Sequence, residues 1–364
     1  MSMGRPRGPC PGASCEGLSL LRAERGARAM LTDRLAAAVD QDLERAARLL
    51  RGGELVAFPT ETVYGLGADG LSGSAVARIF KAKGRPQDNP VILHVASLPT
   101  AAGLYEASPW QAQALARLAE AFWPGPLTLV VPKTSLVPSR VSAGGSSVAL
   151  RVPQHPVALA LLEAVGRPLA APSANRSGRP SPTTADHVLR TLDGRIAAVL
   201  DGGPTPLGYE STVLSLLNDQ PILLRPGALS PDALEAVLGQ PVLTTEGSAK
   251  ATAGEGTPAL APGLRHRHYA PDAVTLRFAD LAALQQAWTG GEAILCRSET
   301  ARRLGPRRAP LIVLPDTPEG FGRALYDGLY ALEAADVPLA WVEPLPEGAS
   351  WAALRDRLQR AVAG

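Results

Sequence analysis

The sequence has few cysteines and no long apolar run, and each absence excludes a class of protein. Its 364 residues include three cysteines, Cys10, Cys15 and Cys296. Three thiols cannot build a disulfide framework or complete a four-cysteine zinc site. No apolar stretch reaches the roughly 20 residues that a membrane-spanning helix needs. We therefore expect free thiols in a reducing cytoplasm and no membrane partner.

Neither sign of charge dominates, and aromatic residues are scarce. The formal net charge is +2, and Phe, Trp and Tyr make up 4% of the chain. A broad nucleic-acid surface needs an excess of basic residues, and base stacking needs aromatic rings. Any contact with RNA is therefore expected to be a local patch.

Lysine is scarce as well, and the places where it occurs are informative. It is found at four positions, and arginine supplies the rest of the 36 basic residues. Lys81 and Lys83 stand beside Arg85, just before an apolar segment. Lysine offers phosphate a point charge and arginine a rigid fork. The segment predicts a polyphosphate site at Lys83 and Arg85, whereas Lys81 is interpreted only as a cation at a helix C-terminus.

The apolar pattern alternates between the periods of strands and helices, which predicts an α/β sheet domain. Helices are expected at 31–51, 74–83, 109–122, 155–165, 185–192 and 230–238. Strands are expected at 54–58, 90–95, 127–131, 147–152, 169–171, 197–200, 211–215 and 222–225, with a turn-rich loop at 60–67.

Composition divides the chain into four parts. Residues 1–29 are rich in Gly, Pro and Arg, and we expect a disordered extension with Met30 as the natural start. The α/β pattern occupies 30–243, and a stretch poor in large apolar residues then predicts a linker over 244–271. Residues 272–364 are expected to form a second, small α/β domain, with strands at 293–296, 311–314 and 339–342 and helices at 320–335 and 351–362.

Several polar residues stand where predicted strands end. Arg151 and Arg225 close two strands, and the loops 60–65 and 171–175 carry small polar residues and glycine. Ligands of open α/β sheets bind at strand ends, although a lone arginine can face solvent and such a loop can be an ordinary turn. His266 and His268 suggest a metal pair, but no nearby Cys or carboxylate completes it, so a basic linker is favoured.

Seven segments, taken together and in order, resemble one family. They are PTETVYGLG at 59–67, KGRP at 83–86, NP at 89–90, WPGPLT at 123–128, APSAN at 171–175, ESTV at 210–213 and LRPG at 224–227. Their order and spacing resemble the YrdC-like L-threonylcarbamoyl-AMP synthases. The HYAP motif at 268–271 and the region after it resemble the longer members of that family.

The resemblance implies an enzyme that makes L-threonylcarbamoyladenylate from L-threonine, bicarbonate or CO2, and ATP, releasing pyrophosphate. The product would pass to a tRNA threonylcarbamoyl transferase complex for modification beside the anticodon, with weak tRNA binding at most. The implied fold is a twisted mixed sheet with a large positive cavity, followed by a small Rossmann-like domain. Magnesium is expected to arrive on the ATP phosphates, with no metal ligand from the protein.

The resemblance also implies roles for individual residues. The expected L-threonine contacts are Thr62, His94, Arg151, Ala171 and Ser211, with Arg151 as the fork for the carboxylate. The expected ATP contacts are Arg85, Asn89, Ser147, Ser173, Asn175, Ser181, Arg225 and Tyr269. Lys83, Arg85 and Arg225 are the expected catalytic cations, with Lys83 and Asn175 at the phosphates. Tyr269 implies that the linker closes over the nucleotide.

Two other functions compete with this one. A non-enzymatic RNA-binding module could use the same basic cavity, although the low net charge and few aromatic residues count against it. A carbamoyltransferase for hydrogenase maturation uses a related domain, but such proteins carry Cys-rich zinc motifs that three scattered cysteines cannot supply.

Overall fold

Two β-sheets organise the part of the chain that the structure describes. The computed structural model describes residue 1 and residues 31–244, 269–272, 274–287, 292–305 and 310–362. Across the first, mixed sheet the strands are β1 (Asp33–Ala36), β8 (Ala198–Asp201), β2 (Val56–Phe58), β3 (Gly65–Asp69), β7 (Leu169–Ala170), β4 (Ile92–His94), β6 (Ser147–Arg151), β5 (Leu127–Pro132), β9 (Thr212–Ser215), β10 (Ile222–Arg225) and β11 (Leu243–Thr244). Across the second, parallel sheet they are β12 (Thr275–Phe278), β15 (Leu339–Val342), β13 (Ala293–Arg297) and β14 (Leu311–Leu314). The predicted α/β fold with a mixed sheet is confirmed.

Helices cover both faces of the first sheet, and their ends follow local sequence signals. They are α2 (Asp40–Arg51), α3 (Gly73–Lys83), α4 (Pro109–Phe122), α5 (Pro156–Val165), α6 (Ala185–Leu192) and α7 (Pro231–Leu238), with a 3-10 turn η1 at Pro99–Ala101. Ser72 caps α3, and Ser108 forms a capping box with Gln111 at the start of α4. Gly84 ends α3 with a φ of 62°, a conformation that glycine adopts at little cost.

The alternation of strand side chains separates two apolar cores. Val56 and Phe58 of β2 pack with α2 and α5, whereas Ala57 between them packs with α3 and other helices on the opposite face. Since both faces are covered, the strand ends are the part of the sheet left to hold a ligand.

The N-terminal helix predicted over 31–51 is wrong in its first part. Asp33–Ala36 forms β1, which pairs in parallel with β8, and α2 begins only at Asp40. The Asp42 carboxylate accepts a hydrogen bond of 2.8 Å from the Ala36 amide, which holds the turn between them. Pairing with β8 at the edge of the sheet has overridden the amphipathic pattern, because a short segment has little helical stability of its own.

The loop predicted over 60–67 is also partly wrong, because Gly65 begins strand β3. This strand pairs antiparallel with β2 and is buried along its whole length. A methyl group on Gly67 would lie 2.9 Å from the Phe58 ring. The glycines that suggested a turn therefore serve close packing inside a strand.

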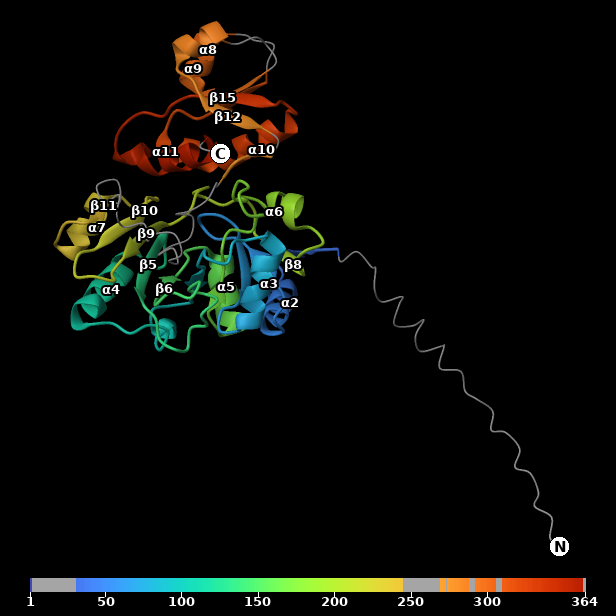
Figure 1. Cartoon of the computed structure of the whole chain (residues 1–364), viewed down its shortest axis with the longest axis vertical. Helices are drawn as coiled ribbons and strands as arrows, with labels where there is room; N and C mark the ends of the chain where they lie inside the picture. Colours follow the sequence, from blue (N-terminus) through green and yellow to red (C-terminus); the bar gives the residue numbers. More distant parts are fainter. Residues whose placement is uncertain (2–30, 245–268, 273, 288–291, 306–309, 363–364) are drawn as a thin grey trace.

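The second sheet carries α8 (Leu281–Ala287), α9 (Ser298–Leu304), α10 (Pro318–Ala334) and α11 (Ala349–Val362). Figure 1 shows α10 and α11 on the side that faces the first sheet. The contact includes main chain on both sides: a methyl group on Gly208, whose φ is +86°, would lie 2.5 Å from the carbonyl oxygen of Gly322. Of the helices described, none is long and apolar enough to cross a membrane.

Candidate active site

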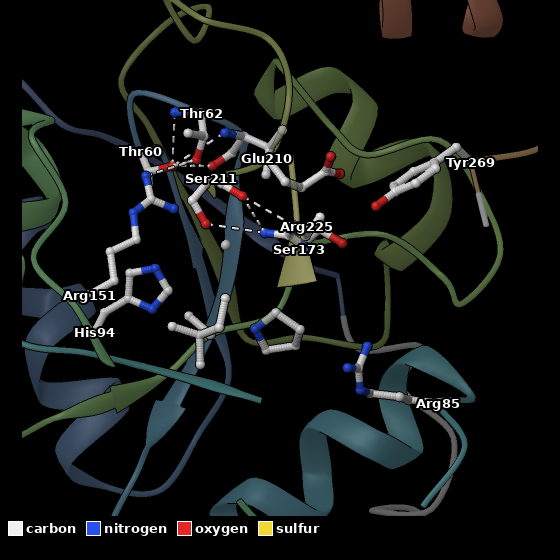
Figure 2. A pocket seen from close by; sticks show the side chains of 15 residues that line it. Thr60, Thr62, Arg85, His94, Arg151, Ser173, Glu210, Ser211, Arg225 and Tyr269 are labelled. Carbon is white, nitrogen blue, oxygen red and sulfur yellow. Dashed lines mark hydrogen bonds between the residues drawn. The ribbon is translucent and has the colours of Figure 1, made fainter. Parts of the chain in front are cut away.

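A cavity opens where several strands of the first sheet end (Figure 2). His94 ends β4, Arg151 ends β6 and Arg225 ends β10, while Ser211 immediately precedes β9. His94 and Arg151 are direct partners in the parallel β4–β6 ladder. The cavity is lined by Thr60, Thr62, Val63, Gly65, Arg85, Ile92, His94, Arg151, Ala171, Pro172, Ser173, Glu210, Ser211, Arg225 and Tyr269.

All five residues predicted to contact L-threonine lie on this wall, and Arg151 is their charged member. Arg151 is 4% exposed and forms an ion pair of 2.7 Å with Glu61. Its Nη2 also donates to the Thr62 hydroxyl at 3.0 Å, and its Nε donates to the Gly125 carbonyl at 3.4 Å. These bonds fix the plane of the guanidinium, and Nη1 has no hydrogen-bond partner among the described residues. The arrangement suits a carboxylate that approaches from the cavity.

His94 is an uncharged polar group in the same wall. Burial, reinforced by the charge of Arg151, lowers the pKa of His94 to about 3. The ring packs edge-on against Phe58 with 6.3 Å between centroids, and Nδ1 has no hydrogen-bond partner among the described residues. A neutral imidazole with an unused nitrogen can contact a polar substrate without adding charge.

The depressed pKa of His94 predicts a stability loss in acid. Between pH 6.5 and 3 the unfolded chain binds a proton that folded His94 does not, so the free energy of unfolding falls as the pH falls. From pH 6.5 to 5 the loss from this residue is about 2 kcal/mol. Denaturant titrations of the wild type and of His94→Gln should show this extra loss in the wild type alone. Equal losses in both proteins would show that folded His94 can bind the proton.

Arg85 and Arg225 supply positive charge on other parts of the wall (Figure 2). The Arg85 side chain donates to the Asn89 carbonyl at 3.0 Å, the Asn89 Oδ1 at 2.7 Å and the Pro90 carbonyl at 2.7 Å. Arg225 donates to the Ser211 carbonyl at 3.0 Å and to the Ser211 hydroxyl at 3.1 Å. Burial lowers the pKa of Arg85 to about 10 and also lowers that of Arg225. An anion bound in this poorly solvated cavity would stabilise the charged form of both guanidinium groups.

Lys83 lies behind the cavity wall and not on it. Its buried amino group donates to the carbonyl oxygens of Ser173 and Asn175 at 2.6 and 2.5 Å, and its own carbonyl accepts from the Ser177 amide at 2.8 Å. Burial, followed by the charge of Arg85, lowers the pKa of Lys83. The sequence placed Lys83 at the phosphates, whereas the structure places its amino group on the main chain of the loop that carries Ser173.

The predicted ATP contacts divide into two sets. Arg85, Ser173, Arg225 and Tyr269 line the cavity. The other four, Asn89, Ser147, Asn175 and Ser181, are not on its wall. Asn175 donates to the carbonyls of Arg176 and Arg179, and Ser181 donates to Glu210, so these two side chains shape the loops around the site.

Glu210 lines the cavity beside Ser211, and the sequence pattern alone indicates no role for it. Its carboxylate accepts from the Ser181 hydroxyl at 2.5 Å, the Tyr326 hydroxyl at 2.9 Å and the Arg357 Nε at 2.7 Å. Burial opposes ionisation, but Arg357, Arg225 and these bonds outweigh it and lower the pKa of Glu210 to about 2. A usable signal was present, because Arg357 interrupts the apolar face of α11 between Leu354 and Leu358.

Among the residues that the structure describes, no three His, Cys, Asp or Glu side chains are close enough together to hold a metal ion. His266 and His268 lie outside the described residues, so their suggested pairing stays untested.

Two family models together match most of the chain. The Sua5/YciO/YrdC family model, described as telomere recombination, matches residues 48–227, and the model for the C-terminal domain of threonylcarbamoyl-AMP synthase matches residues 229–363. The threonylcarbamoyl-AMP synthase of Bacillus subtilis is 41% identical over 343 residues, which cover 89% of this chain and 94% of the relative. That of Pyrococcus abyssi is 41% identical over 323 residues, which cover 87% and 92%.

A solved structure agrees with these relatives. The crystal structure of P. abyssi Sua5 complexed with L-threonine superposes with a TM-score of 0.80 at 38% identity, covering 92% of this chain and 98% of that one. The similarity extends across both sheets, and the sequence identity is high enough to establish more than a shared fold. The chain therefore belongs to the threonylcarbamoyl-AMP synthase family of enzymes, in the form that carries the additional C-terminal domain.

Proposed function

We propose that this chain joins L-threonine, bicarbonate or CO2, and ATP into L-threonylcarbamoyladenylate and releases pyrophosphate. The observation that carries the proposal is the distribution of charge in one cavity. Arg151, with Thr62 and His94, provides a site for an amino-acid carboxylate, and Arg85 and Arg225 provide separate positive charge for phosphate. The P. abyssi relative whose structure contains L-threonine supports the assignment of the first site.

The reaction needs positioning and charge stabilisation more than a protein nucleophile. The neutral amine of threonine captures CO2 as a carbamate, and a carbamate oxygen then attacks the α-phosphate in line while pyrophosphate leaves. Arg151 holds the carboxylate, and the hydroxyls of Thr62 and Ser211 are placed to orient the amino acid. Arg85 and Arg225 stabilise the negative charge that grows on the phosphate oxygens.

Lys83 is assigned a supporting part in this reaction. Its amino group fixes the loop that presents Ser173 to the nucleotide, so it acts on ATP through the main chain. Any magnesium ion is proposed to arrive on the ATP phosphates. Glu210 is poorly suited to bind it directly, because its carboxylate already accepts bonds from Ser181, Tyr326 and Arg357.

The remaining assignments concern the chain as a whole. We assign residues 30–243 to the catalytic domain, 244–271 to a linker and 272–364 to the second domain. Tyr269, near the end of the linker, is buried and lines the cavity, which supports closure of the linker over the nucleotide. The product is a reactive mixed anhydride, so a cytoplasmic enzyme would hand it to a transferase that modifies tRNA.

The proposal is tested by pyrophosphate release from ATP and bicarbonate, measured with and without L-threonine. We expect release to depend on L-threonine, and D-threonine serves as the matched control. Release that does not respond to L-threonine would refute the proposed reaction. RNA binding with a steep salt dependence and no such release would instead favour the RNA-binding module.

A further inference from the structure

One side chain from the helices that pack on the second sheet contacts a residue of the cavity wall. Arg357 of α11 is charged, yet it is 1% exposed and lies among the buried, apolar residues of that helix. Its Nε donates to Glu210 at 2.7 Å, its Nη2 donates to the Pro226 carbonyl at 3.0 Å, and its Nη1 pairs with Asp356 at 2.5 Å. Its guanidinium carbon lies 5.7 Å from the centre of the Tyr269 ring.

The partners of Arg357 are close neighbours of the residues proposed to act on substrate. Glu210 precedes Ser211 in the chain, and Pro226 follows Arg225. Tyr269 itself forms part of the cavity wall. One guanidinium therefore contacts three separate segments that meet at the nucleotide side of the cavity.

A second side chain from the same layer completes the environment of Glu210. The Tyr326 hydroxyl of α10 lies 3.0 and 2.9 Å from the two carboxylate oxygens. With Arg357 and Ser181, it satisfies both oxygens of a buried charge, which is costly to leave unpaired. Arg225 is the other cation whose charge acts on Glu210. Without Arg357, Glu210 would compete with phosphate for Arg225.

We propose that Arg357, assisted by Tyr326, is a positioning residue that the second domain contributes to the reaction. It holds Glu210, Pro226 and Tyr269 in place and keeps the charge of Glu210 engaged away from Arg225. The inference rests on the proposed function, because it concerns the ATP side of that same cavity. It gives the second domain a role in catalysis besides carrying the linker.

The first test compares Arg357→Lys with Arg355→Lys. Arg355 lies on the same helix, bonds to the Pro346 carbonyl within its own layer and does not contact Glu210. Lysine keeps the charge at position 357 but cannot reproduce the three-way fork. We expect kcat/KM for ATP to fall at least roughly tenfold in Arg357→Lys alone, with the KM for L-threonine changed less than about threefold. The expected fall lies in a higher KM for ATP, because a general loss of folded protein would lower kcat and leave both KM values unchanged.

The second test compares Tyr326→Phe with Tyr330→Phe. Both tyrosines lie on α10 and donate across to the first sheet's layer, but Tyr330 donates to the Pro180 carbonyl at 2.9 Å and not to Glu210. Each variant loses one hydroxyl, so both should fold. We expect only Tyr326→Phe to lower kcat/KM for ATP, by about threefold or more. If Arg357→Lys does not fold, this pair of tyrosine variants still tests whether the contacts to Glu210 affect the use of ATP.

The outcomes separate this inference from the proposed function. An inactive wild type refutes the proposed function itself. An active wild type in which both members of each pair behave alike overturns only the role of Arg357. Equal rises in the KM values for ATP and L-threonine would likewise overturn it, since they would indicate general loosening of the cavity.

Discussion

Replacing Arg151 with lysine is expected to raise the KM for L-threonine by roughly 100-fold. The substitution keeps a positive charge beside Glu61, so the buried carboxylate is not left without a cation. It removes the fork that meets Thr62, Gly125 and an incoming carboxylate at once. Loss of one or two charge-assisted hydrogen bonds to substrate costs about 3 kcal/mol, which is the stated change in affinity. Initial rates of pyrophosphate release against L-threonine concentration measure it.

Arg167→Lys is the matched control for that experiment. Arg167 pairs with Asp69 at 2.8 Å, but it is half exposed and does not line the cavity. We expect this variant to keep the wild-type KM values. If Arg151→Lys changes the KM for L-threonine less than about threefold, Arg151 does not bind the substrate carboxylate, whatever the effect of the substitution on stability.

Replacing Lys83 with methionine is expected to lower both stability and activity. The change leaves the carbonyl oxygens of Ser173 and Asn175 without their buried donor, and each such loss costs about 1–3 kcal/mol. The loop that carries Ser173 then loses its anchor, so pyrophosphate release should fall by roughly 100-fold or more. Thermal unfolding and steady-state kinetics of the same preparation measure the two effects together.

The matched control is Lys81→Met, on the same helix two residues earlier. Lys81 is exposed, and its loss should change neither the melting temperature nor the rate appreciably. If Lys83→Met instead keeps the wild-type melting temperature and raises only the KM for ATP, Lys83 contacts phosphate directly, as the sequence alone suggested.

Sequence reasoning located the strand ends of the first sheet well, because short apolar runs bounded by Pro and Gly mark them. Helix α4 begins and ends where the pattern predicted, at Pro109 and Phe122. The failures have physical causes. Strand β1 depends on pairing with β8, about 165 residues later in the chain, and no local pattern reports such a partner.

The site shows the same division between what is local and what is not. The arginines that end β6 and β10 could be recognised, because a charge at the end of an apolar strand is visible in the sequence. The direction of the Lys83 side chain could not, since it depends on carbonyl groups of a loop 90 residues away. Arg357 lies 147 residues from Glu210, and only the folded chain brings them together.

The close approach of Gly208 to Gly322 has a consequence for how the two layers can change. Where Gly208 meets the Gly322 carbonyl, main chain lies against main chain, so no side chain between these two residues can be shortened to relieve the contact. A single methyl group at Gly208 would collide with the main chain of Gly322 and Arg323, so α10 or the Gly208 loop would have to shift. This contact therefore limits how closely α10 can approach the loop at Gly208. The hydrogen bond from Arg357 of α11 to Glu210 spans the same interface between the two sheets.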